Sequence, residues 1–189
     1  MKTIAVYLGS SFGDSSQWAA AAFGFGARAA RAGIRIVYGG ADAGTMKSLA
    51  DGVLSEGGEI VGVFPAGFEG RAEIASTDLA RKDLTELHIV RDFDERKRMM
   101  MELSDLAVVL PGSAGTMDEA FGYAVNTEIG AHDKPVWILN EGGYYDGLQR
   151  QIATMIRCGF MSAGESSRMF RFFDSMDDLF TALSSAAVL

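Results

Sequence analysis

The sequence has one cysteine, Cys158, and two histidines, His88 and His132. A single cysteine excludes a disulfide framework and a thiolate metal site, and the histidines lack metal-ligand spacing, so neither a metal nor another cofactor is expected. Cys158 has no partner base in the sequence and is expected to be buried. No apolar run reaches the ~18 to 20 residues that a membrane span requires. No signal peptide precedes the first strand-like segment, which begins at Thr3. These absences favour a cytoplasmic protein without membrane partners.

Basic residues are outnumbered, with 17 Lys and Arg against 25 Asp and Glu and a net charge of -8. A general nucleic-acid binder needs a basic surface for the phosphate backbone, so this class is disfavoured. One bound nucleotide remains compatible with the charge, because a helix N-terminus and a few cations act locally. The length of 189 residues and the 48% hydrophobic content suit a single domain with a sizeable core. We therefore expect residues 1–189 to form a single domain.

Short apolar strands alternate with helix-like segments along the chain. This alternation predicts an α/β fold, with a doubly wound, mostly parallel, Rossmann-like sheet and helices on both faces. Ligands in such folds bind beyond the carboxyl ends of the strands, where the loops at Gly9, Gly39 and Gly112 and the start of the Arg96 helix should meet. The charged loop 66–85 is expected to cross the surface or cover the site. The expected strands are 3–8, 34–38, 60–64, 88–90, 106–110, 136–139 and 169–173, and the expected helices include 15–32, 142–157 and 176–187.

The segment 106–119 is the most informative one. An apolar strand breaks at Pro111-Gly112 and continues as a helix, which presents free backbone N–H groups and a helix N-terminus to an anion. Glu119 lies about one turn beyond Thr116 on the same face, where it suits a group about one sugar away from a phosphate. The residues expected at the phosphate are the small Gly112, Ser113, Ala114 and Gly115, together with the Thr116 hydroxyl.

A second informative helix begins after residue 90. Asp92 and Glu95 have capping-box spacing, with Asp92 as the N-cap. Arg96 then heads an apolar stripe that includes Met99 and Met100. An arginine in that position points into the protein, where it needs an anionic partner.

The glycine-rich loops also invite a dinucleotide-dependent dehydrogenase interpretation, which the details disfavour. No G-x-G-x-x-G follows the first strand. The strand 60–64 ends in Val63-Phe64-Pro65, without the acidic residue that would hold the ribose hydroxyls.

The motifs Glu95-Arg96-Lys97 and Pro111-Gly-x-x-Gly115-Thr116-x-x-Glu119, with the glycine loop 38–46, are specific in combination. Over nearly its whole length the sequence resembles the LONELY GUY (LOG) family of cytokinin riboside 5′-monophosphate phosphoribohydrolases, many of which carry the older description lysine decarboxylase-like. The resemblance implies hydrolysis of the N-glycosidic bond of a nucleoside 5′-monophosphate, a cytokinin-riboside-monophosphate or AMP-like substrate. The products would be the free base and ribose 5-phosphate. A true lysine decarboxylase is disfavoured, because no pyridoxal-binding pattern is present.

The resemblance assigns catalysis to Arg96 and Glu119. An ionised carboxylate near the ribose would stabilise an oxocarbenium-like transition state. The helix N-terminus and Arg96 both favour the charged form of Glu119, so we expect it to be ionised and a poor general acid. The residues implied at the substrate or its phosphate are Gly9, Ser10, Gly39, Gly40, Gly44, Met46, Glu73, Lys97, Gly112, Ser113, Ala114, Gly115 and Thr116.

Departures from the family pattern at Ala41, Asp94, Ser113, Val125 and Asn126 leave the accepted base open.

LOG proteins are typically dimers, which implies a homodimer through the Arg96 helix and the helix 116–130. Molybdenum cofactor carrier proteins resemble the same family, so a non-catalytic nucleotide or cofactor carrier is the alternative. Arg96 and Glu119 favour the enzyme, because a carrier has no need of a carboxylate beside the ribose.

Overall fold

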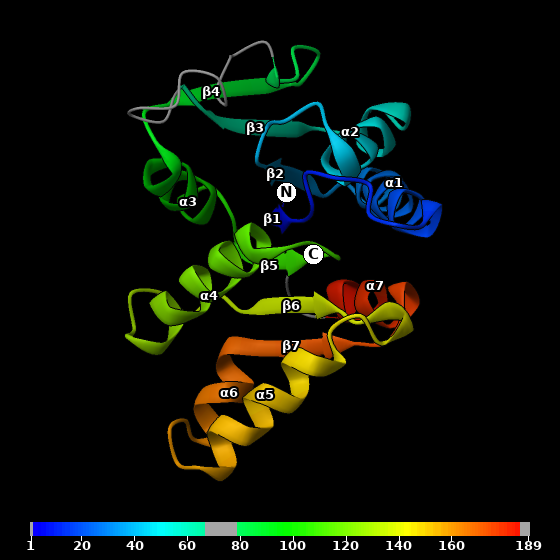
Figure 1. The fold of residues 1–189 in the computed structure, drawn as a ribbon. Helices are drawn as coiled ribbons and strands as arrows, with labels where there is room; N and C mark the ends of the chain where they lie inside the picture. Colours follow the sequence, from blue (N-terminus) through cyan, green and yellow to red (C-terminus); the bar gives the residue numbers. More distant parts are fainter. Residues whose placement is uncertain (1, 67–78, 186–189) are drawn as a thin grey trace.

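The structure, a computed structural model, describes residues 2–66 and 79–185 (Figure 1). Its centre is a seven-stranded sheet in the order β4-β3-β2-β1-β5-β6-β7, in which all neighbouring strands pair in parallel. This arrangement confirms the predicted doubly wound α/β fold. The strands are β1 (Thr3–Tyr7), β2 (Arg35–Tyr38), β3 (Ile60–Pro65), β4 (Glu86–Val90), β5 (Leu106–Val109), β6 (Val136–Leu139) and β7 (Phe170–Phe173).

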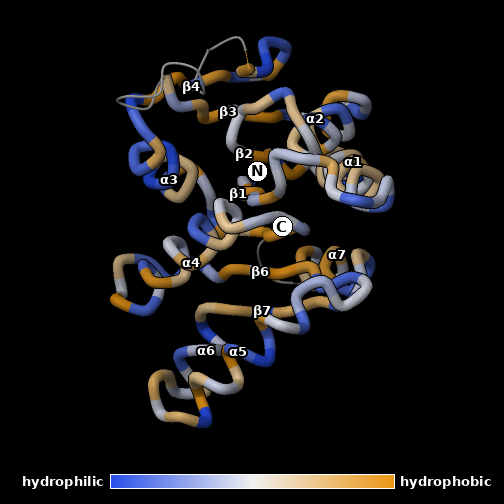
Figure 2. The backbone as a smooth tube through the Cα atoms, viewed as in Figure 1, coloured by the Kyte–Doolittle hydropathy of each residue, from blue (hydrophilic) through white to orange (hydrophobic). Residues whose placement is uncertain are grey.

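Helices cover both faces of the sheet, and Figure 1 shows α1, α2 and α7 on the side opposite α3 and α4. Alternation along β1 explains the two layers, because Ile4 and Val6 belong to one core cluster whereas Ala5 and Tyr7 belong to the other. Burial on both faces makes the inner strands nearly continuous apolar runs, as Figure 2 shows for β6. The helices are α1 (Ser16–Arg31), α2 (Gly44–Ser55), α3 (Phe93–Glu102), α4 (Ala114–Glu128), α5 (Asp146–Arg157), α6 (Ala163–Met169) and α7 (Met176–Ser185).

The C-terminal third differs from the prediction in three places. The helix expected from residue 142 begins at Asp146, because Gly142 and Gly143 have φ values of 68° and 75° around a short 3₁₀ turn. Helix α6 was not predicted, since its seven residues are too few to show a helical period; a capping box between Ser162 and Glu165 starts it. Cys158 is exposed instead of buried, because it follows the last residue of α5 as its C-cap.

Helices α1 and α2 pack at close range through glycine. A Cβ atom added at Gly52 would lie 2.1 Å from the Phe23 carbonyl oxygen, and one added at Gly26 would lie 2.3 Å from the Leu49 carbonyl oxygen. Any side chain at these positions would push the helices apart. The close contact fixes α2 against the element that follows β1.

The topology creates a crevice at the centre of the sheet. The chain winds outward from β1 through β2 and β3 to β4, and then returns to β5 on the other side of β1. The loops after β1 and β5 therefore leave the carboxyl edge in opposite directions, which is the switch point where such folds bind ligands. Within residues 2–66 and 79–185, no helix combines the length and apolar character that a membrane crossing needs.

Candidate active site

A cavity of about 350 Å³ opens at this switch point. It lies between the loops after β1, β2 and β3 and the N-terminal ends of α3 and α4. The loops after β1 and β5 contribute the polar residues Ser10, Ser113 and Thr116, whereas the segment after β2 and the end of β3 contribute mainly apolar side chains. Because the sheet order separates β3 from β5 by β2 and β1, the cavity has a polar end and an apolar end. The cavity is lined by Leu8, Ser10, Gly39, Ala41, Ala43, Met46, Phe64, Pro65, Leu79, Phe93, Arg96, Ser113, Gly115, Thr116 and Glu119.

The polar end is formed by the turn between β5 and α4. Ser113 is the N-cap of α4 in an extended conformation, and its side chain makes no capping hydrogen bond. The Ser113 hydroxyl therefore satisfies none of the N–H groups in the first turn of α4, which suits them to bind an anion. A Cβ atom added at Gly112 would lie 2.1 Å from Thr116 Oγ1, so only glycine allows the Thr116 hydroxyl to occupy its position.

Two hydrogen bonds hold this turn from outside the cavity. The Tyr144 hydroxyl donates to the Gly112 carbonyl oxygen at 2.7 Å. The Gly9 N–H donates to the Pro111 carbonyl oxygen at 3.2 Å and joins the loop after β1 to the loop after β5. The polar end is thus fixed by contacts from both halves of the sheet.

Arg96 and Glu119 meet in the middle of the cavity wall. Asp92 starts α3 as predicted, because its carboxylate accepts from the Glu95 N–H at 2.8 Å. The Arg96 guanidinium donates through Nη2 to Glu119 Oε1, and its Cζ lies 4.6 Å from the centre of the Phe93 ring. This contact confirms the expected anionic partner of Arg96. Arg96 Nε is buried and has no hydrogen-bond partner in the part of the chain that the structure describes.

The ionisation of Glu119 differs from the sequence-based expectation. Its side chain is only 4% exposed, and burial raises the pKa of Glu119 to about 7, although Arg96 favours the charged form. Loss of hydration therefore outweighs the nearby cation. Near neutral pH both protonation states are therefore populated. The expectation that Glu119 is fully ionised was wrong, and its pKa does not make it a poor general acid.

Several other residues predicted from the sequence also line the cavity. Ser10 comes from the loop after β1, and Gly39 and Met46 come from the segment between β2 and α2. Gly115 and Thr116 lie in the first turn of α4, where the anion was expected. These contacts place these five predicted residues around the same space as Arg96, Ser113 and Glu119.

The remaining glycines lie behind or beside the cavity. Gly9 and Gly112 line a neighbouring hollow of about 270 Å³ with Trp18 and Tyr144. Gly44 has a φ of 53°, and an added Cβ would lie 2.3 Å from the Ser10 carbonyl carbon, so its backbone supports the loop after β1. Gly40 has a φ of 74° and packs against Phe64, and Ala114 lies exposed at the start of α4.

Lys97 points away from the main cavity. Its Nζ lies 2.9 Å from an Asp118 carboxylate oxygen and 3.3 Å from one of Asp94, and these carboxylates raise the pKa of Lys97. It lines a separate cavity of about 340 Å³ between α3 and α4, which Glu119 also reaches. Glu73, the other charged residue predicted at the substrate, lies outside the described residues.

Apolar lining residues are what the sequence analysis missed. Phe64 and Pro65 end β3, and Phe93 is the first residue of α3, so all three lie where the predicted carboxyl edge is. Their position after a strand or at a helix start was the available signal. Leu79 carried no such signal, because it lies in an unpatterned loop. Among residues 2–66 and 79–185, no group of three or more His, Cys, Asp or Glu side chains could hold a metal ion.

Comparisons with known proteins identify relatives of this chain by sequence and by structure. The family model described as "Possible lysine decarboxylase" matches residues 46–183. The cytokinin riboside 5′-monophosphate phosphoribohydrolase of Rhodococcoides fascians is 38% identical over 168 residues, which cover 89% of this chain and 82% of that protein. The Arabidopsis thaliana enzyme LOG1, which has the same name, is 33% identical over 85% of this chain and 73% of its own length.

Solved structures support the fold. The molybdenum cofactor binding protein of Rippkaea orientalis superposes with a TM-score of 0.71 at 17% identity, covering 97% of this chain and 96% of that one. The molybdenum cofactor carrier protein of Chlamydomonas reinhardtii gives a TM-score of 0.69 at 16% identity, with coverage of 97% and 96%. At these identities the likeness concerns the fold alone. The sequence matches and the shared motifs establish that this chain belongs to the LONELY GUY family, whose family model is described as "Possible lysine decarboxylase".

Proposed function

We propose that this protein hydrolyses the N-glycosidic bond of a nucleoside 5′-monophosphate to the free base and ribose 5-phosphate. The observation that carries the proposal is the buried Arg96–Glu119 pair, which lies about one helical turn from an anion-binding turn in the same cavity. The names of the matched relatives describe the same chemistry.

The shape of the cavity supports one orientation of the nucleotide. Its 5′-phosphate binds the first turn of α4 at Gly115 and Thr116, where backbone N–H groups and the helix dipole favour an anion. The ribose then lies beside Glu119, one turn further along α4. The base occupies the apolar end, against Met46, Phe64 and other apolar side chains.

The chemistry requires charge stabilisation at the ribose more than a strong nucleophile. As the C1′–N bond breaks, its electron pair leaves with the base, which takes up a proton, and positive charge develops on the ribose. The ionised carboxylate of Glu119 stabilises that charge. Water adds its oxygen to C1′ and loses a proton, which completes the balance. Arg96 holds Glu119 in place, and its guanidinium lines the cavity, where it can donate to the substrate.

We expect hydrolysis to require the 5′-phosphate. The turn at α4 supplies binding energy remote from the scissile bond, which positions the ribose in the transition state. Purified protein should release base from AMP or another nucleoside monophosphate with a kcat/KM at least about 100-fold higher than for the matching nucleoside. The measurement is chromatographic detection of free base from a panel of nucleotides and nucleosides. Equal kcat/KM for both classes would contradict the proposed orientation.

Tight nucleotide binding without base release from any member of the panel would favour the alternative, a carrier on the same fold. A retained, buried carboxylate beside the ribose argues against this outcome, because binding alone gains little from it.

We also propose that the protein is a homodimer through α3 and α4. Large apolar side chains are exposed on these helices and at their ends, namely Leu103, Val125 and Ile129, the last of them 70% exposed. A subunit interface across α3 and α4 would remove these side chains from water, which is favourable.

A further inference from the structure

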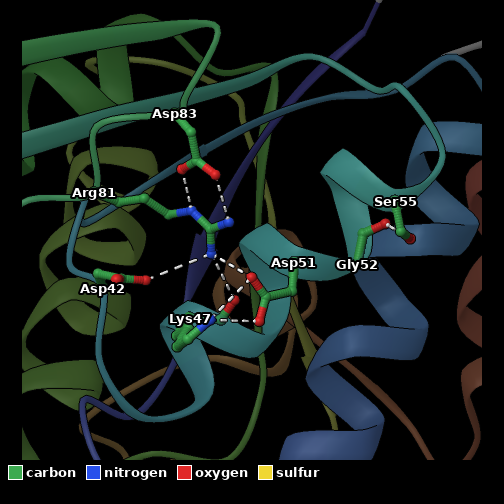
Figure 3. A network of polar contacts seen from close by, with 7 residues as sticks. All are labelled: Asp42, Lys47, Asp51, Gly52, Ser55, Arg81 and Asp83. Carbon is green, nitrogen blue, oxygen red and sulfur yellow. Dashed lines mark hydrogen bonds and ion pairs between the residues drawn. The ribbon is translucent and has the colours of Figure 1, made fainter.

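Arg81 forms the centre of a polar network beside the active site (Figure 3). Its side chain is 9% exposed and has three carboxylates around it. The guanidinium binds Asp83 through two hydrogen bonds of 2.6 and 3.0 Å and Asp51 through one of 2.6 Å, and it lies 3.6 Å from Asp42. It also donates to the Lys47 carbonyl oxygen at 3.3 Å.

The network fastens a short strap, residues 79–81, to the turn that follows β2. The Arg81 N–H donates to the Gly40 carbonyl oxygen at 2.9 Å, and the Asp42 N–H donates to the Leu79 carbonyl oxygen at 2.9 Å. Between them, Ala41 and Ala80 form an isolated antiparallel bridge. The Arg81 side chain then extends to Asp51 on α2, so it joins the strap, the turn and the helix.

Both segments joined by Arg81 face the candidate active site. Leu79 from the strap and Gly39 and Ala41 from the turn line the main cavity. A Cβ atom added at Gly39 would lie 3.3 Å from Arg96 Nη1 and 3.4 Å from Met46 Sδ. The turn therefore packs closely against the Arg96 guanidinium. Any displacement of this turn changes both the apolar end of the cavity and the position of Arg96.

We propose that Arg81 is a positioning residue of the active site, which holds the strap and the turn so that Leu79, Gly39 and Arg96 keep their places around the base and ribose. This inference rests on the proposed function for its catalytic consequence. Stability alone does not account for the network, because a buried ion cluster gains little over packed apolar residues. The guanidinium fits the geometry, since its planar fork binds Asp83 bidentately while another nitrogen reaches Asp51.

Arg81→Lys tests this role, because it keeps the positive charge but cannot form the bidentate contact with Asp83. The matched control is Arg35→Lys: Arg35 also joins two strands through a carboxylate, Glu86, but at the amino edge of the sheet. We expect Arg81→Lys to lower kcat/KM for AMP by about 10- to 100-fold. It should also change the ratio of kcat/KM between AMP and an N6-alkyl AMP, since Leu79 and Ala41 bound the apolar end. Arg35→Lys should leave both quantities within about twofold of wild type.

Binding separates a failure of this inference from a failure of the proposed function. The Kd of AMP, measured by calorimetry, should rise about tenfold in Arg81→Lys and stay unchanged in Arg35→Lys, even if no variant hydrolyses any nucleotide. Asp83→Asn, which weakens the bidentate contact while Asp51 remains, should shift the same quantities by a smaller factor and serves if Arg81→Lys does not fold. Unchanged Kd and unchanged substrate ratio in a folded Arg81→Lys or Asp83→Asn would overturn the inference. The inference would also be overturned if the Kd and the substrate ratio changed in Arg81→Lys and Arg35→Lys alike, in proportion to the fall in melting temperature of each variant.

Discussion

Glu119 combines a cationic partner with nearly complete burial, and these two conditions act on its pKa in opposite directions. The partner could be expected from the sequence, because Arg96 heads an apolar stripe and needs an anion. The burial could not, because exclusion of water depends on how α3, α4 and β1 meet in space. Motif spacing therefore predicts which groups touch but not which protonation state they hold.

Glu119→Gln should lose activity while keeping much of its nucleotide affinity. The amide preserves size and some hydrogen bonding to the ribose, but it removes the negative charge that the transition state needs. We expect kcat to fall by about two to three powers of ten. Base release and calorimetric AMP binding, measured side by side, check this. Asp118→Asn is the control, since Asp118 is the preceding carboxylate on the same helix and is exposed; wild-type turnover in Glu119→Gln would mean that the carboxylate is structural.

The pH dependence of the wild-type enzyme should report the raised pKa of Glu119. If the ionised carboxylate stabilises the ribose cation, kcat/KM rises with pH through an apparent pKa of about 7. A pH–rate profile between pH 5 and 9 measures it, and Asp118→Asn should move the acidic limb to lower pH, because the Asp118 carboxylate contributes to the raised pKa of Glu119. An acidic limb centred near 4.5, the ordinary value of a glutamate, would contradict the effect of burial.

The same pKa has a consequence for folding. Because the folded-state pKa lies above the unfolded one, the neutral carboxyl is favoured in the fold. The contribution of Glu119 to the free energy of unfolding is therefore fully present below pH 4.5 and is lost as the pH rises through about 7.

At the scale of elements, the strands and the longer helices were predictable because their apolar residues follow a clear period. The ends of β6 and the N-cap of α3 at Asp92 agree with the sequence pattern to the residue, whereas α4 spans 114–128 in place of the expected 116–130. Helix α6 and the 3₁₀ turn at Glu141–Gly143 were not predictable, since capping and glycine conformation define them more than hydrophobic period. Lys97 and Arg96 line different cavities, because adjacent helix residues differ by about 100° around the axis.

The contact between α1 and α2 should depend on glycine at one face only. Gly52→Ala should lower the free energy of unfolding by about 1–3 kcal/mol, because the new Cβ would meet the Phe23 carbonyl oxygen. Gly24→Ala is the matched control in α1, since nothing lies within 4 Å of its added Cβ. That control should raise stability by about 0.5–1 kcal/mol, as alanine favours a helix. Urea unfolding measures the free energy of unfolding of both variants. Equal changes in the two variants would mean that close packing of α1 against α2 does not require glycine.

At the scale of the whole molecule, the proposed dimer should depend on the α3–α4 surface. Ile129→Asp should convert the dimer to a monomer, because it buries a charge in an apolar interface. Phe160→Asp is the control, since Phe160 is 87% exposed beyond the end of α5, outside the proposed interface. Light scattering coupled to gel filtration gives the mass of each variant. A monomeric wild type, or a dimer that survives Ile129→Asp, would remove the proposed interface.

The position of β1 between β2 and β5 also sets an order of assembly during synthesis. Ile4 pairs with Ile36 on one side and with Leu106 on the other, so the second partner leaves the ribosome much later than the first. Until then, the β5-facing edge of β1 carries unpaired backbone groups, which chaperones or other nascent chains can engage. Arg96 is synthesised before β5 and Glu119 after it, so the ion pair closes only once the second half of the sheet has docked. The nascent chain thus completes the proposed catalytic pair in one late step, and until then Arg96 lacks the Glu119 carboxylate as its counterion.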